Sequence, residues 1–333
     1  MPGAILRLSR AFLSMKDDMI QSALYLITGG CGFIGSHIAE ELVALGRKVR
    51  ILDNLSFGYV DNIAHIKDKV EFQKGDIRNP KDIDIAIKGA KYVFHEAALV
   101  SVFDSVNRPV DNNDINITGT LNVLESAKKN GVKRVVMASS AAVYGNNPDL
   151  PKTENMKPEP ESPYAVGKII GEYYFKVFSS LYGLETVALR YFNVYGPRQD
   201  PSSMYSGVIS KFSDCLAKKE APTIFGDGGQ TRDFVFVKDI VSANILAMNS
   251  PKAGKGDVFN VGTGKQVSLL QLLEAMNGIV GHDYKPSFKD ARSGDIRFSV
   301  SDISRAQEEL GYKPKFSLKN GLEELLRSLK VIS

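Results

Sequence analysis

The stretch TGGCGFIGS, residues 28–36, decides the fold of this chain. An apolar run precedes it at residues 24–27, and an amphipathic helical pattern follows it from Phe33 to Leu45. The glycines let the backbone turn tightly, approach a phosphate closely and pack the helix against the strand. Strand, glycine turn and helix in this order predict a pyrophosphate site at the helix start, formed by Gly29, Gly32, Phe33, Ile34 and Gly35.

A carboxylate follows the next predicted strand. Gly46 ends the helical pattern, residues 48–52 form an apolar run, and Asp53 comes directly after it. Asp53 stands 24 positions beyond the first glycine, Gly29. An acid there accepts hydrogen bonds from both ribose hydroxyls of NAD and repels the 2′-phosphate of NADP. A glycine triplet alone is often an ordinary turn, but here every element is in register, so the sequence predicts NAD as cofactor.

Short apolar runs alternate with helical stretches up to about residue 191. They recur at residues 70–72, 92–95, 135–137 and 186–189. Such strands pair in parallel through right-handed crossovers, so we expect an α/β, Rossmann-type doubly wound sheet. Its ligands bind beyond the carboxyl ends of the strands, where the sequence places Asp53, Asp76, Ile77, Ala97, Ala98, Ser139, Ser140, Tyr191, Phe192 and Asn193.

Turn-rich sequence follows Asn193, with glycine and proline concentrated at residues 196–201 and 226–229. We expect residues 232–237 to return to the sheet, so that a smaller α/β domain is interleaved with the first. The length of 333 residues also favours two domains. The predicted parts are an N-terminal extension (1–22), an NAD-binding domain (23–193 plus 233–262) and a substrate domain (194–232 plus 263–331).

The composition is that of an ordinary soluble globular protein, 43% hydrophobic and 24% charged. The net charge is +4, but Lys and Arg are scattered among acids, so we do not expect nucleic acid as a partner. A mildly basic balance suits an anionic small substrate and equally describes a solvated surface.

We expect a cytoplasmic protein with no membrane partner and no metal. No run approaches the roughly eighteen apolar residues that cross a bilayer. Residues 1–22 lack the small-residue cleavage site of a secretion signal. We interpret them either as a leading helix packed on the fold or as the result of a start codon placed upstream of the true one. Cys31 and Cys215 form no metal or disulfide framework, and the four histidines lack metal-ligand spacing.

The candidate catalytic residues lie downstream of the glycine turn. Tyr164 and Lys168 share one helix face at i and i+4, and Pro163 favours a helix start just before them. The ammonium, together with a cationic nicotinamide ring, would lower the pKa of the phenol and make it a general base. A Tyr-Lys pair at this spacing is often only a solvated helix pair, but Ser140 at the end of a predicted strand could hold a substrate hydroxyl beside it.

From about residue 23 to 331 the chain resembles the extended short-chain dehydrogenases/reductases, within them the UDP-hexose 4-epimerases, and most closely the UDP-N-acetylglucosamine 4-epimerases. The motifs that carry the resemblance are TGGCGFIGS, Asp53-Asn54-Leu55, Gly75-Asp76-Ile77, His95-Glu96-Ala97-Ala98, Ser139-Ser140-Ala141-Ala142-Val143-Tyr144-Gly145, Ser162-Pro163-Tyr164 to Lys168, Arg190-Tyr191-Phe192-Asn193 and Arg292-Ser293-Gly294-Asp295.

The resemblance implies a hydride cycle on a UDP-sugar. Tyr164 would remove the 4-hydroxyl proton while NAD takes the hydride from C4, with Ser140 holding the oxygen and Lys168 keeping the phenolate available. The 4-keto sugar would turn over and take the hydride back on its other face. NAD would stay bound and unchanged.

The resemblance also implies the remaining contacts. It places Asn54, Asn116 and Tyr191 on NAD. It places Ser101, Asn193, Val208, Arg232, Arg292 and Asp295 on the substrate, with the arginines on the diphosphate and Asp295 on the uridine ribose. Ser299 falls at the gate beside the sugar's 2-substituent, where a small residue leaves room for an N-acetyl group. We therefore expect UDP-GlcNAc/UDP-GalNAc interconversion, with UDP-Glc/UDP-Gal as further substrates.

Three residues depart from the family pattern and leave the substrate preference open. Ala141 and Ala142 replace common hydroxyl residues, and Val100 replaces a lysine of many relatives. The same alanines speak against a nucleotide-sugar 4,6-dehydratase, which needs an acid pair there. A UDP-glucuronate 4-epimerase or decarboxylase and a non-catalytic NAD-binding regulator remain alternatives. The family habit is a homodimer formed by helices around residues 112–130 and 164–181.

Overall fold

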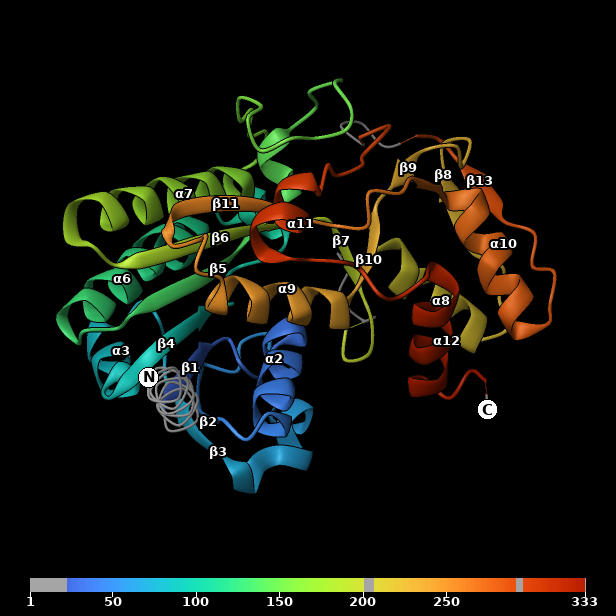
Figure 1. Ribbon diagram of the computed structural model, residues 1–333. Helices are drawn as coiled ribbons and strands as arrows, with labels where there is room; N and C mark the ends of the chain where they lie inside the picture. Colours follow the sequence, from blue (N-terminus) through green and yellow to red (C-terminus); the bar gives the residue numbers. More distant parts are fainter. Residues whose placement is uncertain (1–22, 201–206, 292–295, 333) are drawn as a thin grey trace, which may run out of the picture.

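The computed structural model describes residues 23–200, 207–291 and 296–332 (Figure 1). The proposed extension at residues 1–22 and the predicted substrate residues Arg292 and Asp295 lie outside these ranges.

Seven parallel strands form the central sheet in the order β11-β6-β5-β4-β1-β2-β3. The strands are β1 (Leu24–Thr28), β2 (Lys48–Asp53), β3 (Val70–Lys74), β4 (Ala90–His95), β5 (Arg134–Ser140), β6 (Glu185–Tyr191) and β11 (Lys255–Val261). The strand order reverses on either side of β1, which creates the switch point where ligands bind in such sheets. The predicted Rossmann-type fold is confirmed.

Helices cover both faces of the sheet (Figure 1). One face carries α2 (Phe33–Ala44), η1 (Val60–Lys69), α9 (Val237–Asn249) and α11 (Ser304–Leu310); the other carries α3 (Pro80–Ile87), α6 (Thr120–Lys129) and α7 (Pro163–Tyr182). Side chains of β1 alternate between the two cores, since Tyr25 and Ile27 pack on the first and Leu26 on the second. Four short helical elements lie in the connections between strands and helices. Between β4 and α6 these are α4 (Val102–Asn107), α5 (Pro109–Asn113) and the π-helix η2 (Asp114–Gly119), and between β5 and α7 it is η3 (Ala141–Tyr144).

A second, smaller part has its own apolar core. It contains α8 (Val208–Ala217), α10 (Leu269–Val280), α12 (Leu318–Ser328) and three two-stranded sheets: β7 (Asn193–Tyr195) with β10 (Phe234–Phe236), β8 (Thr223–Phe225) with β13 (Ser287–Lys289), and β9 (Thr231–Arg232) with β12 (Val267–Ser268).

The prediction that residues 232–237 return to the central sheet is wrong. β10 pairs in parallel with β7 instead, and the chain rejoins the central sheet only at β11. The reason is packing: the Phe236 ring lies 5.5 Å from that of Tyr195 and 4.7 Å from that of Phe316, inside the second core. A short apolar run has the same sequence pattern in the central sheet as in a small two-stranded sheet, so the pattern does not show which sheet the strand joins.

None of the helices in the described ranges combines the length and apolar character of a bilayer-spanning segment.

Candidate active site

A cavity of about 470 Å³ lies at the carboxyl ends of the central strands. The predicted catalytic residues Ser140, Tyr164 and Lys168 all line it, as does Asn193 of the predicted substrate contacts. The predicted cofactor residues that line it are Gly29, Gly32, Phe33, Ile34, Gly35, Asp53, Asn54, Asp76, Ile77, Ala97, Ala98, Tyr164, Lys168 and Tyr191.

The glycine turn leaves bare backbone facing this cavity. Gly29 has φ +71°, a conformation that favours glycine, and a Cβ on Gly35 would lie 2.2 Å from the carbonyl oxygen of Gly29. α2 starts at Phe33 with no acidic residue in its first turn. The first amides of a helix have no intrahelical acceptor and carry the positive end of its dipole, so this cradle fits a pyrophosphate.

Asp53 is held rigidly at the end of β2. Its buried carboxylate accepts hydrogen bonds from the amides of Cys31 (2.9 Å) and Leu55 (2.8 Å), one on each oxygen. Burial raises its pKa, and the two amide donors oppose this shift. Each oxygen keeps a further lone pair, so the group can still accept hydrogen bonds from a ribose diol. Cradle and carboxylate together fit NAD.

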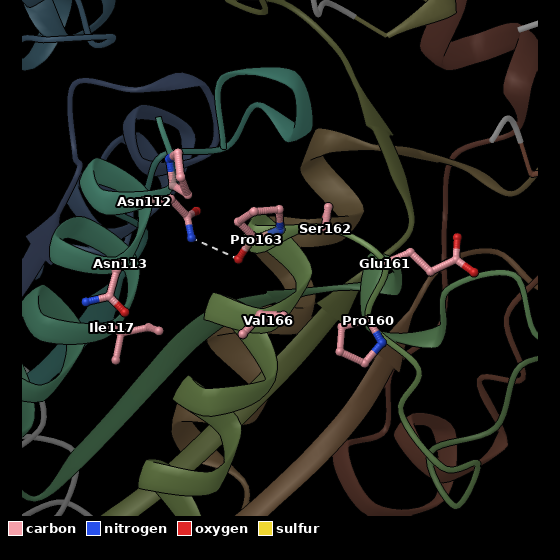
Figure 2. A pocket seen from close by; sticks show the side chains of 9 residues that line it. Asn112, Asn113, Ile117, Pro160, Glu161, Ser162, Pro163 and Val166 are labelled. Atoms are coloured by element: carbon pink, nitrogen blue, oxygen red, sulfur yellow. Dashed lines mark hydrogen bonds between the residues drawn. The ribbon is translucent and has the colours of Figure 1, made fainter. Parts of the chain in front are cut away.

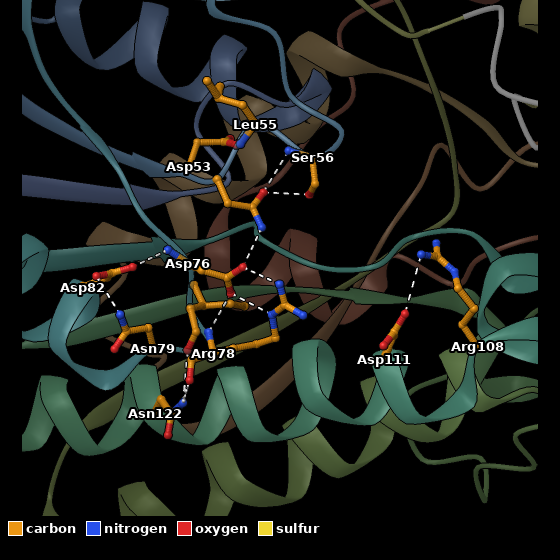
Figure 3. Close-up of polar contacts among 12 residues, drawn as sticks. Asp53, Leu55, Ser56, Asp76, Arg78, Asn79, Asp82, Arg108, Asp111 and Asn122 are labelled. Carbon is orange, nitrogen blue, oxygen red and sulfur yellow. Dashed lines mark hydrogen bonds and ion pairs between the residues drawn. The ribbon is translucent and has the colours of Figure 1, made fainter.

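A second carboxylate, Asp76, lies near the end of β3 (Figure 3). Asn54 Nδ2 donates to it at 2.8 Å and the Arg78 guanidinium at 2.7 Å. The hydrogen bond from Arg78 holds the pKa of Asp76 low, at about 2. Asp76 is therefore charged at any physiological pH, and fixes Asn54 on the cavity wall.

The start of α7, which carries Tyr164, is anchored from two neighbouring helices. The Tyr164 amide donates to Ser105 Oγ of α4 at 3.1 Å. Asn112 Nδ2 of α5 donates to the Pro163 carbonyl at 2.8 Å, in a surface hollow of about 480 Å³ (Figure 2). Ser162 caps the helix through a 3.2 Å bond from the Ala165 amide. The position of Tyr164 is thus set by elements distant from it in sequence.

The protein groups around Tyr164 raise the pKa of its phenol. Burial raises its pKa, the negative charge of Glu96 raises it further, and a hydrogen bond with Ser140 partly opposes the rise. Lys168 Nζ donates 2.8 Å to the carbonyl of Ala138 and lies 5.7 Å from the centre of the Tyr164 ring. Forming a phenolate here requires a further positive charge nearby, which an oxidised nicotinamide ring can supply.

Burial also acts on the ammonium. It lowers the pKa of Lys168 to about 8, and the carboxylates of Glu96 and Glu172 limit the shift. Glu96 lines the cavity beside Ala97, yet the sequence suggested no role for it. Its position directly after a predicted strand, before two small residues, was the available signal.

A buried network lies behind the catalytic side chains. Glu172 of α7 forms an ion pair with Arg190 of β6 at 2.7 Å and accepts a 2.5 Å hydrogen bond from Ser139 Oγ. Both charged side chains are at most 4% exposed. Arg190 also donates to the Tyr144 hydroxyl at 2.9 Å. The network ties α7 to the end of β5, where Ser140 stands.

Of the predicted contacts that fall within the described residues, five do not line the cavity. Asn116 is buried, and its amide bonds both the N–H and the C=O of Leu99, at 2.8 and 3.0 Å. Ser101 caps α4 by accepting from the Asp104 amide. Val208 begins α8, next to Gly207 on the cavity wall.

The other two, Arg232 and Ser299, lie side by side. The Ser299 amide donates to the Thr231 carbonyl at 3.2 Å. The buried Asp233 fixes this region by accepting from Ser301 and from the loop at 263–264, while its own carbonyl accepts from the Asn193 amide. Asp233, which follows Arg232 in the chain, thus links this region to Asn193 on the cavity wall.

The chain matches the model of the NAD dependent epimerase/dehydratase family over residues 25–262. It is 43% identical over 310 residues to a putative UDP-glucose 4-epimerase of Methanocaldococcus jannaschii, which covers 92% of this chain and 98% of that protein.

Two solved structures are similar over nearly the whole chain. A UDP-N-acetylglucosamine 4-epimerase from Methanobrevibacter ruminantium, in complex with UDP-N-acetylmuramic acid, has 40% identity and a TM-score of 0.89, with 93% of this chain and 98% of that one covered. A UDP-glucose 4-epimerase from Thermotoga maritima, with UDP-glucose, has 40% identity and a TM-score of 0.87, with 92% and 98% covered.

Proposed function

Because the chain belongs to the NAD-dependent epimerase/dehydratase family and, within it, to the UDP-sugar 4-epimerases, we propose that it interconverts UDP-GlcNAc and UDP-GalNAc and also accepts UDP-Glc and UDP-Gal. The observation that carries the proposal is that one cavity holds Ser140, Tyr164 and Lys168 together with the glycine turn and Asp53. The groups for proton transfer and the groups for cofactor binding therefore line the same cavity, so both can act on one carbon of a bound sugar.

The proposed roles follow from the chemistry of each side chain. Tyr164 exchanges a proton with the 4-hydroxyl of the sugar, and Ser140, which lines the same cavity, holds the same oxygen. Lys168, oriented by its bond to the Ala138 carbonyl, supplies positive charge beside the phenol. When bound, NAD supplies hydride acceptance and return at C4. The glycine turn and Asp53 hold the cofactor.

The N-acetylated substrate is supported by Ser299. It is small, and its backbone bond to Thr231 keeps it beside Arg232, the proposed diphosphate ligand. Both a UDP-N-acetylglucosamine and a UDP-glucose 4-epimerase are among the similar structures, so the acceptance of both sugar pairs fits the comparisons. Arg292 and Asp295 are proposed to complete the diphosphate and ribose contacts.

The test is turnover of UDP-GlcNAc and of UDP-Glc by purified protein without added NAD, following the 4-epimer of each. UDP-GalNAc is the expected product, with a Tyr164→Phe protein as the inactive control. Product from UDP-Glc alone would contradict the N-acetyl proposal. No product from either sugar, even with NAD supplied, would contradict both, and UDP-glucuronate would then be the substrate to try.

We also infer a homodimer whose second copy covers the outer face of α7. Along this helix Val166, Tyr173, Val177 and Leu181 are 38 to 69% exposed, at spacings of seven, four and four residues. Such spacing places them on one face, and a continuous apolar face of this kind is typical of an interface. Val110 on α5, 70% exposed, adds to the apolar surface.

A further inference from the structure

Asp233 is a fully buried carboxylate with no role in the reaction described so far. It stands between β9 and β10, directly after Arg232, the proposed diphosphate ligand, and its exposed fraction is 0%. A carboxylate out of water is costly unless hydrogen-bond donors satisfy it. Its donors therefore indicate which parts of the chain it holds in place.

In the described part of the chain five donors surround this carboxylate. Thr263 donates to Oδ1 through its amide at 2.8 Å and its hydroxyl at 2.6 Å. The Gly264 amide donates to Oδ2 at 3.0 Å, and Ser301 donates to the same oxygen through its amide at 3.1 Å and its hydroxyl at 2.5 Å. Directional bonds to a charged acceptor fix the position of each donor.

The two donor segments come from different parts of the molecule. Residues 263–264 follow β11, the edge strand of the central sheet, whereas Ser301 belongs to the segment that carries Ser299. The backbone of Asp233 adds a third connection, because its carbonyl accepts from the Asn193 amide, just beyond β6, at 3.0 Å. One residue thus joins the carboxyl ends of β6 and β11 to the segment with Ser299.

The segment with Ser299 runs parallel to the chain at residues 231–233. The Thr231 amide donates to the Arg297 carbonyl at 3.0 Å, and the Ser299 amide donates to the Thr231 carbonyl at 3.2 Å. The Asp233 side chain continues this pairing by accepting from Ser301. The relative positions of Arg232 and Ser299 therefore depend on a pairing that Asp233 completes.

The end of β11 leaves room for this carboxylate. Gly262 precedes Thr263, and a Cβ on Gly262 would lie 2.5 Å from Asp233 Oδ2. Such a contact is too close for any residue with a side chain, so glycine is required for the approach.

We propose that Asp233 is a positioning residue that sets Arg232 and Ser299 against Asn193, and thereby fixes the nucleotide-sugar site relative to the cofactor-binding sheet. The inference rests on the proposed function, which places these three residues on the substrate. Asp233 acts through the main chain and through Ser301, and contacts neither sugar nor cofactor itself. Binding groups need such support, because a side chain that is free to shift loses much of its binding energy.

Asp233→Asn tests this role because an amide cannot replace the carboxylate. Its NH₂ group only donates hydrogen bonds. Whichever oxygen it replaced, at least one backbone amide, that of Thr263 or those of Gly264 and Ser301, would lose its acceptor. We expect the pairing around Arg232 and Ser299 to loosen as a result.

The measurement is the dissociation constant of UDP, obtained by titration calorimetry on purified protein with matched NAD content. Asp233→Asn should weaken UDP binding by roughly tenfold or more, since a misplacement of about 1 Å is enough for such a loss. NAD content should not change, because Asp53 is held by other bonds. In turnover, KM should rise while kcat is retained, because Tyr164 and Lys168 are anchored elsewhere.

Asp239→Asn is the matched control. Asp239 is also a buried carboxylate, 1% exposed, and it accepts from the amides of Lys315 at 2.8 Å and Phe316 at 3.2 Å. Its loss should lower stability but leave the dissociation constant of UDP unchanged. Equal weakening of UDP binding by the two variants would show a general loss of stability, and would overturn the inference.

Unchanged UDP binding by folded Asp233→Asn would also overturn it. Should that variant not fold, Ser301→Ala decides, since it removes the 2.5 Å hydroxyl bond and keeps the amide bond of Ser301. Weaker UDP binding by Ser301→Ala would support the inference, and binding equal to that of the wild type would reject it.

Calorimetry needs no turnover, so the two proposals can fail separately. UDP binding that weakens in Asp233→Asn, in a wild type that forms no 4-epimer, would reject the epimerase reaction and keep the role of Asp233. In an active protein, a lower kcat at unchanged KM and unchanged UDP binding would reject the role and leave the epimerase intact. A wild type without affinity for UDP would reject both.

Discussion

Individual side chains at the sheet edge show how far chemistry follows from residue type. Asp53 and the glycine turn indicate NAD, and membership of an NAD-dependent family confirms this cofactor. The ionisation of Tyr164 does not follow from the lysine one turn away, because burial raises the pKa of the phenol and the charge of Glu96 raises it further. Residue identity gives the candidate acid or base, while its neighbours in space determine its pKa.

Ser299 provides a prediction at the residue scale. Replacing it by Tyr should lower kcat/KM for UDP-GlcNAc by roughly tenfold or more, because the larger side chain fills the space proposed for the acetamido group, and should spare UDP-Glc. Ser299→Ala keeps the site small and should retain both activities. Undiminished UDP-GlcNAc turnover by the Tyr variant would reject the gate.

At the scale of the elements, polar contacts between helices and strands fix the site. The Glu172–Arg190 pair joins α7 to β6, and His95 joins β4 to β1 and α6 through two threonine hydroxyls. Both contacts are buried, so water cannot replace a lost partner. The stability of this region should therefore be sensitive to single changes in charge.

Glu172→Gln should lower the free energy of unfolding by about 3–5 kcal/mol, because it leaves the buried Arg190 without a counter-charge. Urea unfolding of the variant and the wild type measures the difference. Glu125→Gln removes a half-exposed partner of Lys128 on α6 and should change stability by less than about 1 kcal/mol. Similar effects for the two variants would show that the buried pair contributes little.

His95 should make stability fall as the pH is lowered. Its pKa is about 3 in the folded chain, whereas an unfolded histidine titrates near 6.5, so below that value only the unfolded state takes up the proton. This contribution is complete above about pH 6.5 and decreases by about 1.4 kcal/mol per pH unit below it. Unfolding at pH 7.5 and pH 5 should show a smaller loss in His95→Gln than in the wild type, with the exposed His282→Gln as control.

At the scale of the whole molecule, two cores are joined by a chain that crosses between them several times. The central sheet and its helices contain the glycine turn, Asp53 and the catalytic helix α7. The second core holds α8, α10 and α12 and places Arg232 and Ser299 near Asn193. We propose that the first part, 23–193 with 233–262, binds NAD and the second, 194–232 with 263–331, binds the nucleotide sugar, although Phe234 and Phe236 pack in the second core.

The assembly gives the prediction at this scale. Leu181→Glu places a charge in the proposed α7 interface and should convert a dimer into a 36.5 kDa monomer, as measured by light scattering during size-exclusion chromatography. Ile85→Glu, at a similarly exposed apolar residue of α3, should leave the mass unchanged. A monomeric wild type, or a dimer that survives Leu181→Glu, would contradict the proposed interface.

The sequence by itself determined the sheet type, the cofactor and the 4-epimerase class, because these depend on contiguous motifs whose geometry is local. A glycine turn between strand and helix forms the same cradle wherever it occurs. Even the i and i+4 spacing of Tyr164 and Lys168 needed only a helix, and α7 is one.

Only the tertiary structure decided what meets at the strand ends. The Tyr191 hydroxyl donates to Glu96 because parallel pairing brings the ends of β4, β5 and β6 together, although the two residues are far apart in the chain. For the same reason β10 joined β7 rather than the central sheet, since the second core, absent from any local pattern, buries its phenylalanines. Burial and long-range charge depend on the assembled fold, so no short window of sequence contains them.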